Sequence, residues 1–407
     1  MPYRKIIAAI TFLLGVVIFF VQCIGKSSQL TTNDPRGNSY AGSVTCMSCH
    51  KDIANSYAHT NHFRTSSLPN RDELRRLMNG SGNEGHYADL STAKVEEKDS
   101  GFYQYHVSNG KIVRSGKMDI AFGSGEKAQT YGYWSGTRLF ELPLTWFASE
   151  QTWTNSPGFP AEHPYFDRVI PSRCFECHAS YISKTDVASG PLQMTEQLNA
   201  STIVYGIDCE RCHGPAAEHV QFHQQNPDVK KAMHIGSIQA LARQRQLDLC
   251  ASCHSGNDLG VQRTLFAFKP GDSLSNFYYP DFGPAPAEPD VHGKQMQLLR
   301  ASKCFQLSTM TCTTCHNTHE TEENKMNVFT GKCVDCHGQS THAVEMKTAG
   351  KSCIDCHMPL QASKSLEFNN GSQTKSLTYY LRTHRIAIYD RSITTPPVRP
   401  IMLSSVH

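Results

Sequence analysis

The chain has 407 residues, with 39 basic and 36 acidic side chains and a formal net charge of +3. No run of like charges stands out, so nucleic-acid binding has no support. The length alone predicts two or three domains. The unusual feature of the composition is its 16 cysteines and 20 histidines.

The first segment, residues 1–25, is predicted to be a signal sequence or membrane anchor. Arg4 and Lys5 precede an apolar run over residues 6–24. As a helix this run would span roughly 28 Å, enough to cross a bilayer core. Cys23 stands where a lipidated cysteine would lie, and residues 26–40 form a polar linker. We therefore expect an exported protein on the periplasmic side of the membrane, anchored by an N-terminal helix or by lipidated Cys23.

Seven Cys-x-x-Cys-His motifs follow, the pattern by which c-type haem is attached. Both thiols add to the haem, and the histidine is the proximal ligand of the iron. The sequence therefore predicts seven covalently attached c-type haems. The cysteines that bind them are Cys46, Cys49, Cys174, Cys177, Cys209, Cys212, Cys250, Cys253, Cys312, Cys315, Cys333, Cys336, Cys353 and Cys356, and the proximal histidines are His50, His178, His213, His254, His316, His337 and His357.

Zinc sites, thioredoxin-like sites and disulfides also use paired cysteines, but they fit this chain less well. A zinc site would not require histidine after every pair, and a thioredoxin-like site needs a single motif in a βαβ setting. The motifs use 14 of the 16 cysteines, which leaves Cys23 and Cys304. No disulfide network remains, and we expect Cys304 to be a small buried thiol.

The second axial position of each iron decides between electron transfer and ligand binding. An iron with histidine at both axial positions has no free coordination site and suits electron transfer. An iron with an open axial position can bind a substrate. Seven of the 20 histidines belong to motifs, and the remaining 13 could close all seven sites. From their positions we expect these metal ligands: His62, His219, His234, His292, His319, His342 and His384.

The fold is predicted to be mainly α with much irregular structure. Residues 41–85 form a first haem segment with a helix over 71–79. Residues 86–150 alternate in polarity and contain Asn109-Gly110, which predicts a small antiparallel β insertion. Residues 151–407 form a six-haem domain with helices over 237–249 and 291–303, separated by a proline-rich strap over 269–290.

Three stretches resemble the cytochrome c-554-like multihaem cytochromes, including uncharacterised seven-haem members. They are the segment from Tyr40 to His62, the segment from Cys209 to His219, and Cys353-Ile-Asp-Cys-His-Met-Pro359. The resemblance implies haem packing like that of hydroxylamine oxidoreductase. It also implies mostly bis-histidine iron, and it supports His62, His219, His292 and His384 as ligands. One haem of the four-haem members is five-coordinate, but its position does not transfer to this chain.

The predicted function is electron transfer along a chain of haems, with a quinol-oxidising complex or other cytochromes as partners. The alternative is a multihaem oxidoreductase that acts on a small nitrogen or sulfur compound at one five-coordinate haem. No motif has the final lysine that often marks the catalytic haem of nitrite reductases. A third possibility is that the β insertion docks a partner protein.

Overall fold

The computed structural model describes residues 33–256, 258–279, 289–321, 326–338, 352–369 and 376–389. The predicted anchor, Cys23 and His342 lie outside these ranges. The chain divides into two compact units. Unit 1 is Met1–Gly42 with Pro215–Ile235, and unit 2 is Ser43–Gly214 with Gly236–His407.

The described part of unit 1 consists of turns around helix α7 (Ala217–Gln225). The backbone amide of Ala217 donates to the carbonyl of Ser39 at 3.0 Å. This bond joins the two pieces of the unit at the start of the helix.

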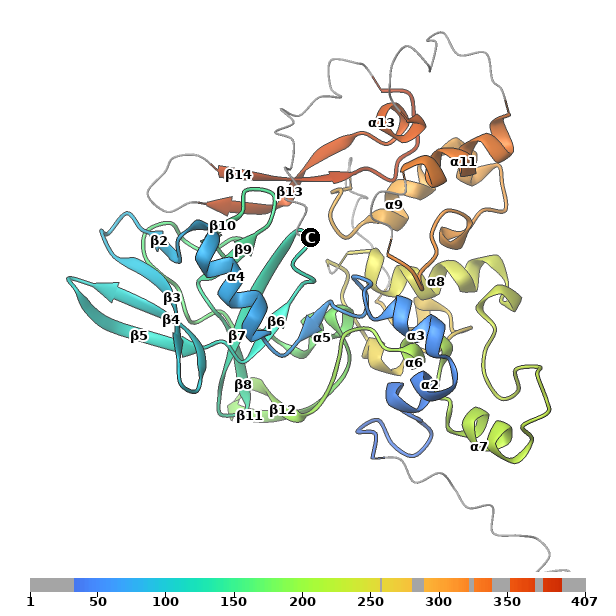
Figure 1. The fold of residues 1–407 in the computed structure, drawn as a ribbon, viewed down its shortest axis with the longest axis horizontal. Coiled ribbons are helices and arrows are strands. Elements are labelled where there is room, and N and C mark those ends of the chain that lie inside the picture. Colours follow the sequence, from blue (N-terminus) through green and yellow to red (C-terminus); the bar gives the residue numbers. More distant parts are fainter. Residues whose placement is uncertain are drawn as a thin grey trace, which may run out of the picture. The chain divides into compact units, whose positions relative to one another are not determined.

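Unit 2 contains two larger antiparallel sheets and two two-stranded ones among its described residues (Figure 1). The four-stranded sheet has the order β2-β3-β4-β5, with bounds Glu84–His86, Thr92–Lys98, Gly101–Ser108 and Lys111–Lys117. The six-stranded sheet has the order β1-β6-β7-β9-β10, with β8 paired to β7. Its bounds are Ser66–Ser67, Ile120–Phe122, Ala128–Ser135, Leu144–Phe147 and Thr152–Asn155, and Arg138–Glu141 for β8.

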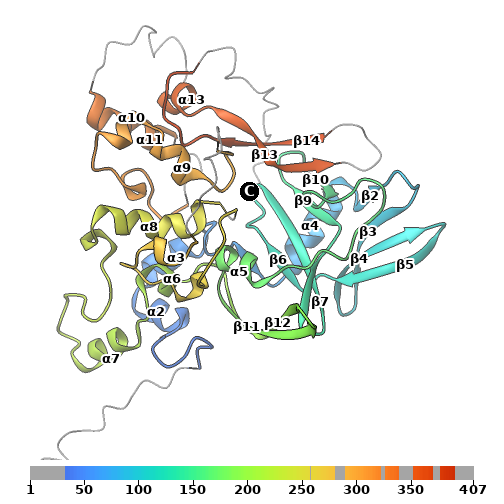
Figure 2. The same cartoon turned by 180° about the vertical axis from the view of Figure 1, so that it is seen from behind.

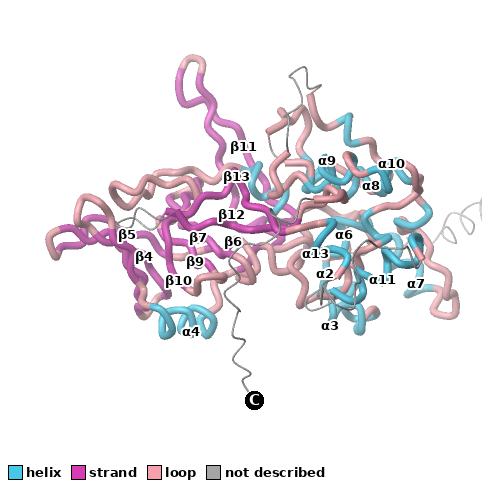
Figure 3. Tube along the Cα trace, turned by 90° about the horizontal axis from the view of Figure 1, so that it is seen from above, coloured by secondary structure: helices cyan, strands magenta, loops and turns pink. Residues whose placement is uncertain are grey.

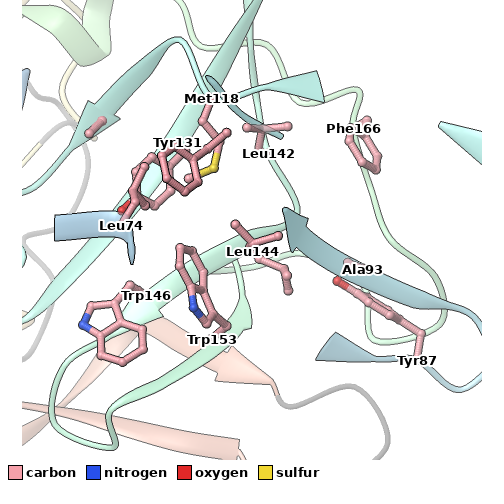
Figure 4. Close-up of a cluster of buried hydrophobic side chains, with 13 residues drawn as sticks. Leu74, Tyr87, Ala93, Met118, Tyr131, Leu142, Leu144, Trp146, Trp153 and Phe166 are labelled. Carbon is pink, nitrogen blue, oxygen red and sulfur yellow. The ribbon is translucent and has the colours of Figure 1, made fainter. Parts of the chain in front are cut away.

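Alternating burial explains the core of these sheets. Ala93, Val95 and Phe102 point inward from β3 and β4, because every second residue of a strand faces the same side. They join a cluster that includes Tyr131 and Trp153, whose ring centroids are 5.8 Å apart (Figure 4). The turn between β4 and β5 is made by Asn109 and Gly110, both with positive φ, as the Asn-Gly pair predicts.

Two hairpins form the two-stranded sheets. The first is β11 (Ala179–Gly190) with β12 (Gln193–Tyr205), and Figure 3 shows its outer half projecting from the neighbouring elements. The second is β13 (Leu360–Asn369) with β14 (Ser376–Arg382). Neither hairpin is predicted from the sequence.

The helices are short, and most carry the motifs described below. The others in unit 2 are α3 (Lys51–Tyr57), α4 (Arg71–Ser81), α9 (Gln295–Arg300) and α10 (Lys303–Gln306). The helix expected over 237–249 starts later, because a 3₁₀ turn over Ile238–Ala240 precedes α8 (Arg243–His254). Among the described residues, no helix is both long and apolar enough to cross a membrane.

The expectation of a mainly α fold is wrong. Strands occupy about as much of the chain as helices, in several antiparallel sheets. The physical reason is that the motif segments form helices of only one to three turns, whereas the described residues between the first and third motifs, and after the seventh, pair as strands. The helical periodicity that would mark a long helix is absent from these spacers.

Candidate functional site

Each motif lies on or directly after a helical turn. Five motif histidines are the last residue of a helix, in α5 (Ser172–His178), α6 (Cys209–His213), α8, α11 (Met326–His337) and α13 (Cys353–His357). The first motif ends just after α2 (Ser43–Cys49), and the fifth begins on a 3₁₀ turn over Cys312–Thr314. A helical turn places two cysteines three residues apart on one face, as double attachment of one haem requires.

Acidic side chains fix the starts of three of these helices. Asp208 accepts the backbone amide of Arg211 at 2.9 Å and caps α6. Ser352 and Asp355 form a reciprocal capping box on α13. Glu196 reaches from β12 to the start of α5, where it accepts the amide and the hydroxyl of Ser172, each at 2.8 Å. Such caps satisfy amides that a short helix leaves without partners.

Thiols from different motifs meet one another. A hydrogen bond with the Cys209 thiol raises the pKa of Cys46, which joins the first and third motifs. Hydrogen bonds likewise raise the pKa of Cys177 beside Cys253 and of Cys250 beside Cys312. The second motif therefore meets the fourth, and the fourth meets the fifth.

The sixth and seventh motifs continue this arrangement. Burial, followed by the charges of the neighbouring Cys353 and Cys315 thiols, raises the pKa of Cys333 to about 11. Helix packing agrees, since α2 contacts α6, α5 contacts α8, α8 contacts the fifth motif and α11 contacts α13. Figure 2 shows α2, α3 and α6 side by side.

These contacts place the motifs in a continuous series. Burial raises the pKa of Cys212 to about 12, and the nearby Cys253 thiol adds to the effect, which links the third motif to the fourth. The series runs from the first motif through the third, fourth, fifth and sixth to the seventh. The second motif lies beside this series and contacts both the third and the fourth motifs.

A buried polar network holds the second, third and fourth motifs together. Glu176, inside the second motif, accepts Thr264 Oγ1 at 2.6 Å, the amide of Leu265 at 3.0 Å and Arg173 at 2.7 Å. Arg211, inside the third motif, donates to the carbonyls of Glu176 and Leu265. Tyr278 accepts from Arg173 at 3.3 Å and donates to the carbonyl of Ser252 in the fourth motif at 3.2 Å.

Within the described part of the chain, ring contacts place three proximal histidines opposite a second histidine. The ring centroids are 6.0 Å apart for His213 and His319, with the ring planes 11° from parallel. They are 6.1 Å apart for His316 and His384, at 26°, and 6.0 Å apart for His254 and His62, at 83°. Two metal–nitrogen bonds of about 2 Å and the two half-rings span roughly 6 Å, so one metal ion fits between the rings of each pair.

The Nδ1 atoms of other motif histidines are engaged by the protein. His357 Nδ1 lies 2.9 Å from the carbonyl of Ala387, and His178 Nδ1 lies 3.0 Å from Thr65 Oγ1. Such a bond on one ring nitrogen orients the ring and leaves Nε2 for a metal. Burial lowers the pKa of His178, which favours the neutral, ligating form.

The remaining predicted ligands are placed differently. His219 and His234 lie in unit 1, where His219 Nδ1 is 2.7 Å from the carbonyl of Met233 and His234 is 3.7 Å from Glu218. His223, which is not among the predicted ligands, packs against His219 with ring centroids 4.7 Å apart. His342 lies outside the described residues.

His292 lies near the second and fourth motifs. Its ring contacts the Tyr379 ring, with the centroids 6.4 Å apart. Burial lowers the pKa of His292, and the charges of His178 and His254 lower it further, against the opposing effect of Asp290. A neutral imidazole close to two proximal histidines is consistent with its prediction as a ligand.

These residues fit a c-type haem in three respects. The thiols are paired on helical turns and none is in a disulfide among the described cysteines. Imidazole pairs are spaced for one metal. Large apolar side chains beside the motifs face solvent, including Val44, Val334 and Ile388 at 83%, 44% and 91% exposure, and an apolar macrocycle would cover such side chains. The described residues contain no group of three or more His, Cys, Asp or Glu side chains arranged to hold a bare metal ion.

Helical Cys-x-x-Cys-His turns with facing imidazoles are the pattern that attaches and ligates c-type haem. Residues 131–214, which contain the second and third motifs, match the family model described as cytochrome c554 and c-prime. The outer cell wall cytochrome OcwA shares the fold, with a TM-score of 0.51 and 17% identity, over 86% of this chain and 79% of that one. No curated protein matches the chain. The resemblance to the cytochrome c-554-like family is confirmed, and c-type haem is its cofactor.

Proposed function

We propose that the protein is an exported heptahaem electron carrier, tethered to the membrane by residues 1–25 or by lipidated Cys23. The observation that carries this proposal is the series of contacts between motif-bearing elements, which includes α2 with α6, α8 with the fifth motif and α11 with α13. A series of contacting motifs is the arrangement that relays electrons across a protein. A ligand-binding enzyme needs only one accessible site.

The side chains around the motifs suit this role. When bound, c-type haem supplies one-electron exchange at its iron, with a potential set by axial ligands, hydrogen bonds and burial. Facing imidazoles such as His213 and His319 would close an iron on both sides. The Glu176–Arg211 network fixes neighbouring motifs at constant separation, and constant separation keeps electron transfer fast without a conformational step.

The organisation and partners of the chain are also part of this proposal. We propose a linker over 26–40, a first haem segment over 41–85, a β-rich insertion over 86–150 and a six-haem part over 151–407. Redox proteins, either a quinol-oxidising complex or other cytochromes, would be the partners. The similar structure is named an outer cell wall cytochrome, which supports a location outside the cytoplasmic membrane.

Removing a single motif tests the series. Replacing Cys250 and Cys253 with alanine deletes the fourth motif, which contacts the second, third and fifth. Replacing Cys353 and Cys356 deletes the terminal seventh motif and is the matched control. Each variant is first checked by intact mass for six haems. On an electrode, the seventh-motif variant should exchange six electrons rapidly, and the fourth-motif variant clearly fewer. Rapid exchange of six electrons by both would refute the series.

A second candidate function rests on His178 in the second motif. Its side chain contacts Thr65 and Phe122. His292 is near enough for the charge of His178 to lower its pKa, but no imidazole ring of the described residues is in ring contact with His178. An iron bound at this motif would have a more accessible distal axial position. We propose as the alternative function that a small nitrogen or sulfur compound, such as nitrite, binds at this motif and is reduced or oxidised there.

Electron paramagnetic resonance separates the two functions. The oxidised, fully loaded protein is measured with and without nitrite. If the protein is only a carrier, all the iron is low-spin and nitrite changes nothing. A high-spin signal that shifts with nitrite, and that disappears when Cys174 and Cys177 are replaced, would favour the enzyme.

A further inference from the structure

We propose that Ser56 and Tyr57, at the end of α3, are positioning residues that hold the His319 ring parallel to His213. The inference rests on the proposed function, because it assumes that these two imidazoles share one iron. It adds that the segment following the first motif sets the ligand geometry of the third.

The backbone of His319 is held from α3. Ser56 Oγ donates to the carbonyl of His319 at 2.8 Å, across 263 residues of sequence. Within its own loop, the His319 amide donates to Asn317 Oδ1 at 3.1 Å. Ser56 therefore provides a long-range anchor that fixes where the loop carrying His319 lies relative to α3.

The ring of His319 is held by Tyr57. The two ring centroids are 6.1 Å apart at 66°, an edge-to-face contact. Tyr57 itself is fixed, because it is buried, its hydroxyl donates to the carbonyl of Ile207 at 2.7 Å, and Phe63 packs against it at 5.8 Å. A fixed aromatic edge against an imidazole restricts rotation of that imidazole.

The three imidazole pairs show how much orientation can vary in this chain. His213 and His319 are 11° from parallel, whereas His254 and His62 are at 83°. Ile207, the acceptor for Tyr57, lies just before α6, which carries His213. Tyr57 thus contacts the His319 ring while its hydroxyl is hydrogen-bonded to the backbone just before α6, the helix that carries His213. One side chain thereby couples the orientations of both ligands.

Ring orientation has a spectroscopic signature. In low-spin ferric haem, nearly parallel imidazole planes give a rhombic spectrum with three resolved g values. Planes near perpendicular give a single, strongly anisotropic feature at low field. The His213–His319 pair should contribute a rhombic signal, and the His254–His62 pair an anisotropic one.

The test is electron paramagnetic resonance of the fully loaded protein carrying Tyr57→Leu, Ser56→Ala or Tyr57→Phe, each checked by intact mass for seven haems. Tyr57→Leu should shift or broaden one rhombic signal and leave the other signals unchanged. Ser56→Ala should shift the same signal less. Tyr57→Phe keeps the ring edge and should retain most of the wild-type signal. Unchanged spectra in Tyr57→Leu and Ser56→Ala would overturn the inference.

One further variant separates a wrong pairing from a wrong positioning role. His319→Ala should convert one low-spin signal to high spin. If it does not, His213 and His319 do not share an iron. If His319→Ala gives high spin but the Tyr57 and Ser56 variants change nothing, the pairing is right and only the positioning role is wrong. If Tyr57→Leu does not mature, Ser56→Ala decides alone, because its hydroxyl can be removed without opening a cavity.

Discussion

Arg211 and Glu176 each stand between the two cysteines of a motif, and hydrogen bonds connect them directly and through Leu265. Arg211 donates to the carbonyl of Glu176 at 3.0 Å, and Glu176 accepts Thr264 and Leu265. A buried charge is tolerated only when such partners satisfy it. At the residue scale, the side chains between the cysteines therefore make contacts that hold motifs in register with one another.

The cap that Glu196 places on α5 gives a pH-dependent prediction. Burial opposes ionisation of Glu196, but its bonds with Lys184 and Ser172 outweigh burial, and the pKa lies below the ordinary 4.5. Its stabilising effect is therefore complete above about pH 4.5 and is lost as the pH falls through the lower folded pKa. Glu196→Gln should cost about 1 kcal/mol at pH 7 by chemical unfolding.

The difference between wild type and Glu196→Gln should shrink as the pH falls below about 4. The control is Asp186→Asn, which removes a carboxylate 3.4 Å from the same Lys184 but caps no helix. A cost in the control equal to that of Glu196→Gln would assign the effect to the ion pair instead of the cap.

Gly206 marks a close approach of two chain segments. It has φ +62°, and a Cβ placed there would lie 1.9 Å from the carbonyl oxygen of Phe63, next to His62. We expect Gly206→Ala to lower the thermal midpoint strongly and to reduce the yield of loaded protein. Gly110→Ala is the control, because Gly110 has φ +74° but no atom within 4 Å, so it should cost only about 1–2 kcal/mol. An equal loss of stability in the two variants would show that the backbone near Phe63 can move to accommodate the added Cβ.

At the element scale, the β strands pack directly on the second motif. Phe122 of β6 contacts the Phe175 ring at 5.3 Å and the His178 ring at 5.9 Å. Ile120, Leu139 and Ile182 complete the same buried cluster. The predicted β insertion therefore supplies one wall of a haem site. This contact favours a structural role over the docking role considered from the sequence.

Replacing Phe122 tests this wall. Phe122→Ala should cost about 3–5 kcal/mol and disturb the spectrum of the haem at the second motif, because both its ring contacts lie there. Phe102→Ala is the matched control, since Phe102 is buried in the other cluster, away from the motifs. Visible and magnetic circular dichroism report the haem, and thermal unfolding reports stability. The same spectral change in both variants would contradict a local role.

The strands show which elements can be predicted from sequence. Burial alternates along the first part of β3 and β4, and Asn109-Gly110 marks the turn that leads into β5; both signals are local. The β11–β12 hairpin carries mostly polar residues such as Ser183, Thr185 and Gln197, so it shows no apolar period. Its pairing depends on cross-strand hydrogen bonds and on the packing of its base, which a local pattern does not reveal.

The site divides in the same way. The motif residues are readable because attachment chemistry fixes their spacing. The second histidine opposite each proximal histidine cannot be read from the sequence. His319 lies three residues after His316 yet faces His213, and His62 faces His254, 192 residues away. Such pairings depend on how the motifs contact one another in space. The position of His223 beside His219 is different, because the two histidines are four residues apart on α7 and helical spacing alone places them side by side.

At the scale of the whole molecule, the haems would complete the core. Buried apolar clusters lie mainly in the sheets and around α8, while apolar side chains beside the motifs, such as Val44 and Ile388, face solvent. Exposed apolar surface of this kind is unfavourable without a cover. We therefore expect protein without haem to be unfolded around the motifs, and attachment to be coupled to folding.

The number of haems per chain is the decisive quantity for a heptahaem carrier. It is measured by the intact mass of the mature protein together with a pyridine haemochrome assay. We expect seven covalently bound haems, one for each motif, with no free thiol among the motif cysteines. A protein that is folded and stable while two or more of its motifs carry no haem would contradict this expectation.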